Sequence, residues 1–203
     1  MFLRKAIARG ASELDARLQL ASVLNQAERL DEARQHFELL CKQENDPKLQ
    51  SMLAAVLDKL GQSGEALAIR KALVEAEPQG IFHWIGYGHS LRFEGRVEEA
   101  ITAYRKAIEI DYEFGEAWWG LASIKQRVLT DKDIVEMQRA IDVAIDIRNS
   151  APTHFALARA YHDRKSYEKA FHHYSIGNRQ RAESIGYQAQ ELTDEVDETI
   201  RTV

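Results

Sequence analysis

Several short stretches of this 203-residue sequence carry residue types that do chemistry in other proteins. Gly86-x-Gly88-x-x-Leu91 begins like a dinucleotide-binding fingerprint, and Gly88-His89-Ser90 places a serine beside a histidine. The fingerprint needs a third glycine, and both a dinucleotide site and a nucleophile elbow need a turn that leads from a strand into a helix. Both stretches instead lie inside a helical pattern, so helix packing explains them better than catalysis does.

The seven histidines raise the question of a metal site. None of them makes an H-x3-H pair, and the adjacent His172 and His173 point about 100° apart on a helix, so they cannot easily share one ion. Glu168 lies four residues before His172, but two weak ligands on one surface helix are usually solvated. The acidic pairs at 31–32 and 98–99 stand at predicted helix starts, where the helix dipole favours them. We therefore expect no catalytic residue, no metal and no cofactor in this chain.

Composition narrows the class of protein. Apolar residues make up 45% and charged residues 29% of the sequence, as in ordinary soluble globular proteins. Only three prolines and 11 glycines are present, which favours helices over a turn-rich β fold. The net charge of −5 argues against nucleic acid as the main partner, and no apolar run is long enough to cross a membrane. The lone Cys41 cannot form an internal disulfide, so we expect a reducing, cytoplasmic location.

Residues 82–111 hold two amphipathic helical patterns separated by a short turn. Apolar and aromatic residues recur at helical spacing in both patterns. Gly88 and Ala100 are small, and they stand where the two packed helices must approach most closely. The larger Trp84 and Tyr104 are expected to fill the space on either side. The region therefore predicts a helical hairpin.

The hairpin pattern recurs along the chain. Its small second-helix residue is found at Ala33, Ala66, Ala100 and Ala170. The first interval is 33 residues and the second is 34, while the third, of 70 residues, corresponds to two stretched periods. This pattern resembles the tetratricopeptide repeat, a helix–turn–helix unit of about 34 residues. The resemblance implies an all-α fold, a right-handed superhelical solenoid of about five such repeats, one of them degenerate, with a C-terminal helix.

The repeat pattern divides the chain into predicted segments. These are the end of a truncated repeat over 1–13, repeats over 14–46, 47–80 and 81–114, a degenerate repeat over 115–150, a repeat over 151–184, and a C-terminal capping or linker helix over 185–203. Asp46 is predicted to cap a helix that has Pro47 in its first turn, and Thr130 to cap a helix that opens with acidic residues. The apolar start of the chain resembles an uncapped repeat, so we expect a longer parent protein.

Three stretches have a narrower likeness, namely residues 84–110, 115–141 and 154–182. They are similar to the repeat region of bacterial tetratricopeptide-sulfotransferase proteins. The more specific parts are Gly115-Glu116-Ala117-Trp118-Trp119 and Tyr174-x2-Gly177-Asn178-x2-Arg181. In that family a sulfotransferase domain that uses the sulfate donor PAPS normally follows the repeats. The resemblance implies the non-catalytic N-terminal arm of such an enzyme. The chain itself is not expected to be an enzyme, because it has no phosphosulfate-loop motif such as Pro-Arg-Ser-Gly-Thr.

The surface expected to bind a partner is the concave one. In stacked hairpins, the first helix of each repeat lines the groove with the face opposite its packing stripe. Aromatic residues beside basic residues on that face are what binding hot spots favour. The predicted groove residues are Lys48, Lys59, Phe82, Ile85, His89, Arg92, Phe93, Trp119, Arg127, Phe155 and Arg159. The alternative is that Phe82, Ile85 and Phe155 merely pack against the neighbouring repeat.

We expect the groove to hold a protein or peptide, or a linked sulfotransferase domain. One alternative is a free-standing scaffold or adaptor with no linked enzyme, and another is self-assembly through uncapped ends. RNA binding is disfavoured by the acidic balance. Repeat modules that clamp chaperone tails need Lys and Asn at two positions that Leu18 and Ser22 occupy here, so that specialised function is not expected. The bound partner, any sulfate acceptor and the oligomeric state stay open.

Overall fold

The computed structural model describes residues 12–124, 126–143 and 147–185. Within these ranges the chain forms ten helices and no strand, which confirms the all-α fold class. The chain has two compact units, residues 1–107 and residues 108–203. Residues 1–11 of the predicted truncated repeat, and all but the first residue of the predicted C-terminal helix over 185–203, lie outside the described residues.

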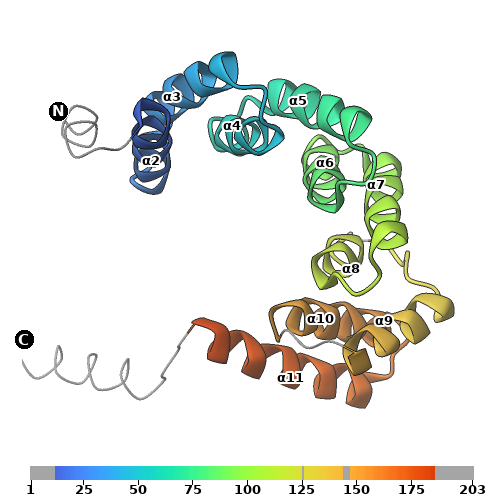
Figure 1. The fold of residues 1–203 in the computed structure, drawn as a ribbon. Coiled ribbons are helices and arrows are strands. Elements are labelled where there is room, and N and C mark those ends of the chain that lie inside the picture. Colours follow the sequence, from blue (N-terminus) through green and yellow to red (C-terminus); the bar gives the residue numbers. More distant parts are fainter. Residues whose placement is uncertain (1–11, 125, 144–146, 186–203) are drawn as a thin grey trace, which may run out of the picture. The chain divides into compact units, whose positions relative to one another are not determined.

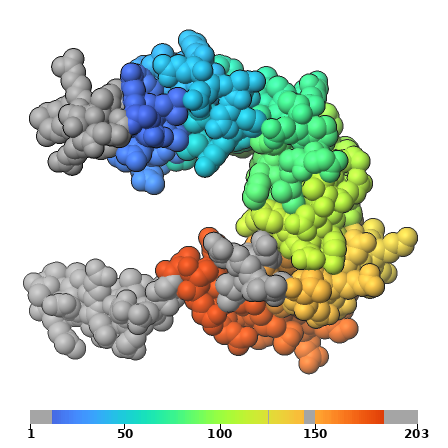
Figure 2. Space-filling view, viewed as in Figure 1, coloured from blue at the N-terminus to red at the C-terminus, as the bar shows by residue number. Residues whose placement is uncertain are grey.

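The first unit is built from helical hairpins. Its helices are α2 (Glu13–Gln26), α3 (Leu30–Gln43), α4 (Pro47–Lys59), α5 (Ser63–Ala76), α6 (Ile81–Phe93) and, up to residue 107, α7 (Val97–Ile110). From α2 to α6 each helix packs against the next, and α4 also contacts α6. The first helices α2, α4 and α6 form one row and the second helices α3 and α5 another (Figure 1). Their side chains close into a continuous surface (Figure 2).

Helix boundaries in the first unit follow local chemistry. Asp46 caps α4, because its carboxylate accepts a hydrogen bond from the Lys48 backbone N–H at 2.8 Å and Pro47 occupies the first turn. This confirms the predicted cap. Gly61 and Gly95 follow the ends of α4 and α6 with φ at 75°, a left-handed conformation that glycine adopts without steric cost.

A close contact between α6 and α7 involves the small residue that the sequence singled out. A Cβ atom at Gly88 would lie 2.7 Å from Cε1 of Tyr104, whose side chain is fully buried. Ala100, one turn earlier on α7, is also fully buried. The Tyr104 ring therefore lies directly on the α6 backbone, in the space that the missing Gly88 side chain leaves.

Arg70 stands where the neighbouring repeats carry an aromatic residue. Its Nη1 donates a hydrogen bond to Asp58 Oδ2 on α4 at 2.6 Å and another to Ser90 Oγ on α6. The Arg70 side chain is only 12% exposed, so its guanidinium links α4, α5 and α6 from the inside. A buried ion pair adds little net stability, but losing one partner leaves an uncompensated charge and is costly.

The second unit is centred on one long helix. It contains the end of α7, α8 (Gly115–Ala122), α9 (Asp131–Val143), α10 (Ile147–Asp163) and α11 (Tyr167–Ile185). Helix α10 packs against α8, α9 and α11 (Figure 1). Thr130 and Asp133 cap α9 reciprocally: the Thr130 N–H donates to Asp133 Oδ2 at 2.6 Å, and the Asp133 N–H donates to Thr130 Oγ1 at 3.3 Å. This confirms the predicted helix start.

Two histidines meet between α10 and α11. His154 is 5% exposed, and its Nδ1 lies 2.9 Å from Nδ1 of His173, whose ring stacks on Tyr161. One of these nitrogens must donate and the other accept, so the contact cannot form when both imidazoles are protonated. Burial, together with the neighbouring His173 and His172, lowers the pKa of His154 to about 4. Burial also lowers the pKa of His173.

Gly88→Ala should destabilise the chain by roughly 1–3 kcal/mol, because the new methyl group would overlap the buried Tyr104 ring. Urea unfolding followed by circular dichroism measures the change. Gly64→Ala is the matched control, since a Cβ at that position in α5 meets no atom within 4 Å. This control should not lose stability, because the added methyl group meets no neighbour and restricts the unfolded chain. A Gly88→Ala variant as stable as the wild type would contradict the close contact.

Lowering the pH from about 7.5 to about 5 should reduce the free energy of unfolding. The pKa of His154 is depressed below 6.5 in the folded chain, so the unfolded chain binds protons more readily. The stability is full above about pH 6.5 and is lost as the pH falls toward 4. Urea unfolding at several pH values measures this decline. His154→Phe should show a shallower decline, and an unchanged slope would contradict the role of the histidine pair.

Candidate functional site

Five of the predicted groove residues lie on α6. Phe82 and Phe93 are 70% and 72% exposed, and His89 lies between them in the sequence. At 100° per residue, these three side chains start from the same side of the helix, here called the α6 face (Phe82, His89 and Phe93). Arg92 is exposed beside it. Ile85 is only 7% exposed, so it packs in the core, as the packing alternative expects, and offers little surface to a partner.

The two lysines predicted for the groove lie at opposite ends of α4. Lys48 is exposed in the first turn, and Lys59 is exposed at the last residue of the helix. Lys59 Nζ lies 3.1 Å from Glu28 Oε1, in an ion pair whose two side chains are both exposed. Such a pair contributes about 0–1 kcal/mol, so it would hinder a competing charged partner only slightly.

A pocket of about 500 Å³ lies between α4 and the second half of α6. Its lining residues are Asp58, His89, Ser90, Arg92 and Phe93. Asp58 Oδ2 is bound to Arg70, whereas Asp58 Oδ1 is buried and has no hydrogen-bond partner among the described residues. A buried acceptor of this kind is costly until a donor reaches it. Because this oxygen has almost no exposed surface, a partner in the pocket would meet the exposed Arg92 rather than Asp58 Oδ1.

His89 is fixed in an uncharged form. Its Nδ1 lies 2.7 Å from the Tyr104 hydroxyl, and the two rings meet edge to face at 5.5 Å. Burial, with Arg92 and Arg70 nearby, lowers the pKa of His89 to about 4. Burial raises the pKa of Tyr104 to about 12. At neutral pH this pair is a polar contact between two uncharged groups.

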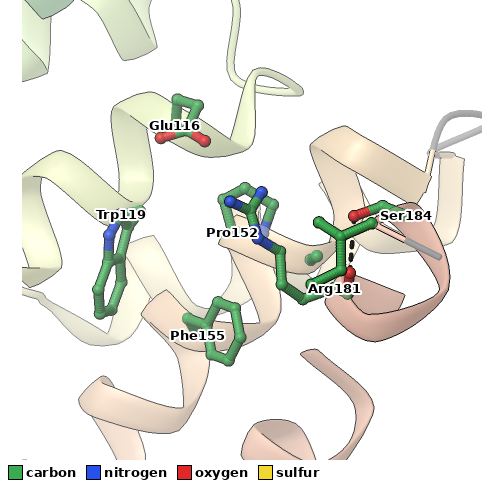
Figure 3. Close-up of a pocket in the computed structure, with 8 residues that line it drawn as sticks. Glu116, Trp119, Pro152, Phe155, Arg181 and Ser184 are labelled. Carbon is green, nitrogen blue, oxygen red and sulfur yellow. Dashed lines mark hydrogen bonds between the residues drawn. The ribbon is translucent and has the colours of Figure 1, made fainter. Parts of the chain in front are cut away.

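Two other predicted groove residues meet in the second unit. The rings of Trp119 on α8 and Phe155 on α10 are 5.8 Å apart with an interplanar angle of 55°, and Trp119 is 38% exposed. Both line a pocket of about 490 Å³ between α8, α10 and α11, here called the aromatic pocket (Figure 3). The lining residues are Glu116, Trp119, Ala151, Pro152, Phe155, Arg181, Ser184 and Ile185.

The remaining two predicted residues do not line the aromatic pocket. Arg159, one helical turn after Phe155, is held by Asp163 through an Nε–Oδ1 contact of 3.0 Å. Arg127 is exposed in the non-helical chain that leads to α9. The binding role of all these residues stays a prediction.

The groove prediction did not include Arg181, a charged residue of the aromatic pocket. It considered only first helices, whereas Arg181 belongs to the second helix α11. One signal was present in the sequence: Gly177 and Arg181 are four residues apart and therefore share a helix face. A Cβ at Gly177 would lie 2.9 Å from Phe155 Cε1, so the Phe155 ring rests directly on α11.

Metal binding and membrane spanning are two further possibilities. Within residues 12–124, 126–143 and 147–185, no group of three or more His, Cys, Asp or Glu side chains is placed to hold a metal ion. None of the helices in those ranges combines the length and apolar character that crossing a membrane requires.

Comparison with known proteins identifies the repeats. Residues 2–49 match a family model described as tetratricopeptide repeat, and residues 88–127 match one described as TPR repeat. Small glutamine-rich tetratricopeptide repeat-containing protein 2 of Mycosarcoma maydis is 31% identical over 84 residues, which are 41% of this chain and 24% of that protein. The match thus spans about a quarter of the length of the curated relative.

Solved structures share the fold at low identity. TTC0263, a thermophilic TPR protein of Thermus thermophilus, has a TM-score of 0.60 at 19% identity, covering 90% of this chain and 99% of that one. BtubC from P. vanneervenii has a TM-score of 0.64 at 16% identity, covering 92% and 88%. MamA from Desulfovibrio magneticus RS-1 has a TM-score of 0.58 at 15% identity, covering 85% and 97%. The chain therefore contains tetratricopeptide repeats and has the all-α solenoid fold of tetratricopeptide-repeat proteins.

Proposed function

We propose that this chain is a protein-interaction module that binds a protein or peptide segment along the first helices of its repeats. The observation that carries the proposal is the exposure of Phe82 and Phe93, 70% and 72%, on one side of a helix whose other side is packed. Aromatic side chains bury a large apolar area when a partner covers them, and they dominate the energetics of interfaces. The α6 face is thus suited to a partner's apolar side chains.

The polar groups beside the α6 face suit a peptide as well. The exposed Arg92 brings a positive charge to the pocket beside this face. His89, with its pKa lowered to about 4 and its contact to Tyr104, suits a fixed polar anchor better than proton transfer near pH 7. These features favour binding over catalysis.

The finer proposal is that the chain is the non-catalytic N-terminal arm of a bacterial, cytoplasmic sulfotransferase that uses PAPS. Its support is the sequence resemblance of residues 84–110, 115–141 and 154–182 to the repeat region of that family. In this role the groove holds a peptide, a substrate protein or the catalytic domain of the same protein. The alternative is a free-standing scaffold or adaptor with no linked enzyme.

The mass of the native protein distinguishes these two roles. If the chain is an enzyme's arm, protein purified from its source should have an intact mass well above 23.2 kDa. The same preparation should transfer labelled sulfate from PAPS to an acceptor. A native mass of 23.2 kDa without sulfate transfer would contradict the sulfotransferase proposal and support the adaptor.

Peptides selected from a displayed random library should bind the double variant Phe82→Ala/Phe93→Ala at least tenfold more weakly than the wild type. Truncating two exposed hot-spot aromatics removes more than about 1.4 kcal/mol of binding free energy. Fluorescence anisotropy measures the affinities, and circular dichroism verifies that the variants are folded. Phe171→Ala is the matched control, because Phe171 is 73% exposed but lies on the second helix α11. Unchanged affinities for the double variant would count against the α6 face.

A further inference from the structure

We propose that the aromatic pocket is a subsite for an aromatic side chain carried by an acidic peptide segment, with a carboxylate next to that side chain paired to Arg181. The proposal rests on the proposed interaction function and names the chemistry of a partner for it. It concerns a pocket in the second unit, so it is independent of the α6 face.

The aromatic wall of the pocket is fixed before any partner arrives. Gly177 is buried, and a Cβ there would lie 2.9 Å from Phe155 Cε1, so Phe155 lies on the α11 backbone with no room to move inward. Trp119 packs against the same ring at 5.8 Å. Side chains that are already ordered lose little conformational entropy on binding, which favours affinity.

The size of the pocket suits one large side chain with its flanking backbone. Its volume of about 490 Å³ lies within the range of about 300–1,000 Å³ that is usual for ligand pockets. Buried Ala151 and Pro152 add further apolar surface beside Trp119 and Phe155. A third aromatic ring can meet these two in an offset or edge-to-face arrangement, which is favourable beyond the apolar area that it buries.

Arg181 places a positive charge at the α11 side of the pocket. Among the residues that the structure describes, the exposed Arg181 guanidinium has no ion pair or hydrogen bond, and only the Arg181 carbonyl is used, accepting from Ser184 Oγ at 2.8 Å. Figure 3 shows Arg181 and Trp119 on opposite sides of the cavity. Glu116 lies on the α8 side, where it repels a second carboxylate, so the favoured acid lies at the α11 side.

Both of the more specific sequence motifs converge on this pocket. The stretch 115–119 supplies the lining residues Glu116 and Trp119, and the stretch 174–181 supplies the lining residue Arg181 and also Gly177, on which Phe155 rests. Gly177 and Arg181 lie one helical turn apart on the same face of α11. Gly177 supports the Phe155 ring, and Arg181 provides the cation. A single face of α11 therefore contributes to both the aromatic contact and the charge contact with the partner.

The test uses two synthetic peptides of equal length. One is acetyl-Gly-Gly-Phe-Asp-Gly-amide, and in the other the aspartate is replaced by lysine. The chain is labelled with 5-fluorotryptophan, which gives a fluorine NMR signal for each of its three tryptophans, and the variant Trp119→Phe identifies the signal of Trp119. The acidic peptide should shift this signal saturably, and the lysine peptide should leave it unchanged at the same concentrations.

Reversing one charge should reverse the preference. Arg181→Glu should weaken binding of the acidic peptide at least tenfold and should allow the lysine peptide to shift the Trp119 signal. Arg179→Glu is the matched control, because Arg179 is exposed on the same helix but does not line the pocket. Its affinity for the acidic peptide should stay within twofold of the wild type. Replacing Phe by Ala in the acidic peptide should abolish the shift.

Several results would overturn the proposal. These are equal binding of the two peptides, binding that Arg181→Glu leaves unchanged, the absence of any shift at Trp119, or a shift with free phenylacetate but with neither peptide. Each of them leaves the selection experiment with Phe82→Ala/Phe93→Ala unaffected, since those residues belong to the other unit. The proposed interaction function fails only if that experiment fails too.

Discussion

In two of the described hairpins, the helices pack closely because an aromatic ring on one helix lies where the other helix has a glycine and therefore no side chain. The Tyr104 ring of α7 lies so close to Gly88 of α6 that even the methyl group of an alanine at position 88 would overlap the ring. In the second unit the roles are reversed, since Phe155 of the first helix α10 lies on Gly177 of the second helix α11. Ridges-into-grooves packing needs such small residues wherever two axes approach most closely.

This constraint also determines what is left for binding. An aromatic ring that packs between helices is not available to a partner, as the fully buried Tyr104 shows. A partner therefore meets only aromatic residues outside the packing stripe. In the first unit these are Phe82 and Phe93, whose side chains stay largely exposed. Phe155 does both, because Gly177 supports one side of its ring while the ring also lines the aromatic pocket.

Much of the fold could be predicted because its signals are local. The caps at Asp46 and Thr130 depend on residues two or three positions away, and the structure has both. The Gly88 contact follows from the order of small and large residues within one hairpin. The place of Arg70 was visible as a missing aromatic, but its partners were not, because Asp58 and Ser90 belong to different helices.

The surface was harder to predict for a physical reason. Helix α6 carries apolar or aromatic residues on nearly every side, so its pattern does not separate a packing face from an exposed face, and Ile85 was placed in the groove although it is buried. Hydrophobic periodicity alone therefore predicts where helices lie better than it predicts which of their faces are exposed.

The aromatic pocket arises where the repeat pattern breaks. Helix α8 ends at Ala122 after eight residues, so Trp119 lies in its last turn, partly exposed. Helix α10 runs for 17 residues and includes Pro152, a residue that a regular helix interior disfavours, and this proline lines the pocket. Departures from local rules are expected at functional or strained sites. The loss of the repeat pattern after residues 115–119 thus indicated where the pocket lies. In that segment the short helix α8 leaves the Trp119 ring available to a partner.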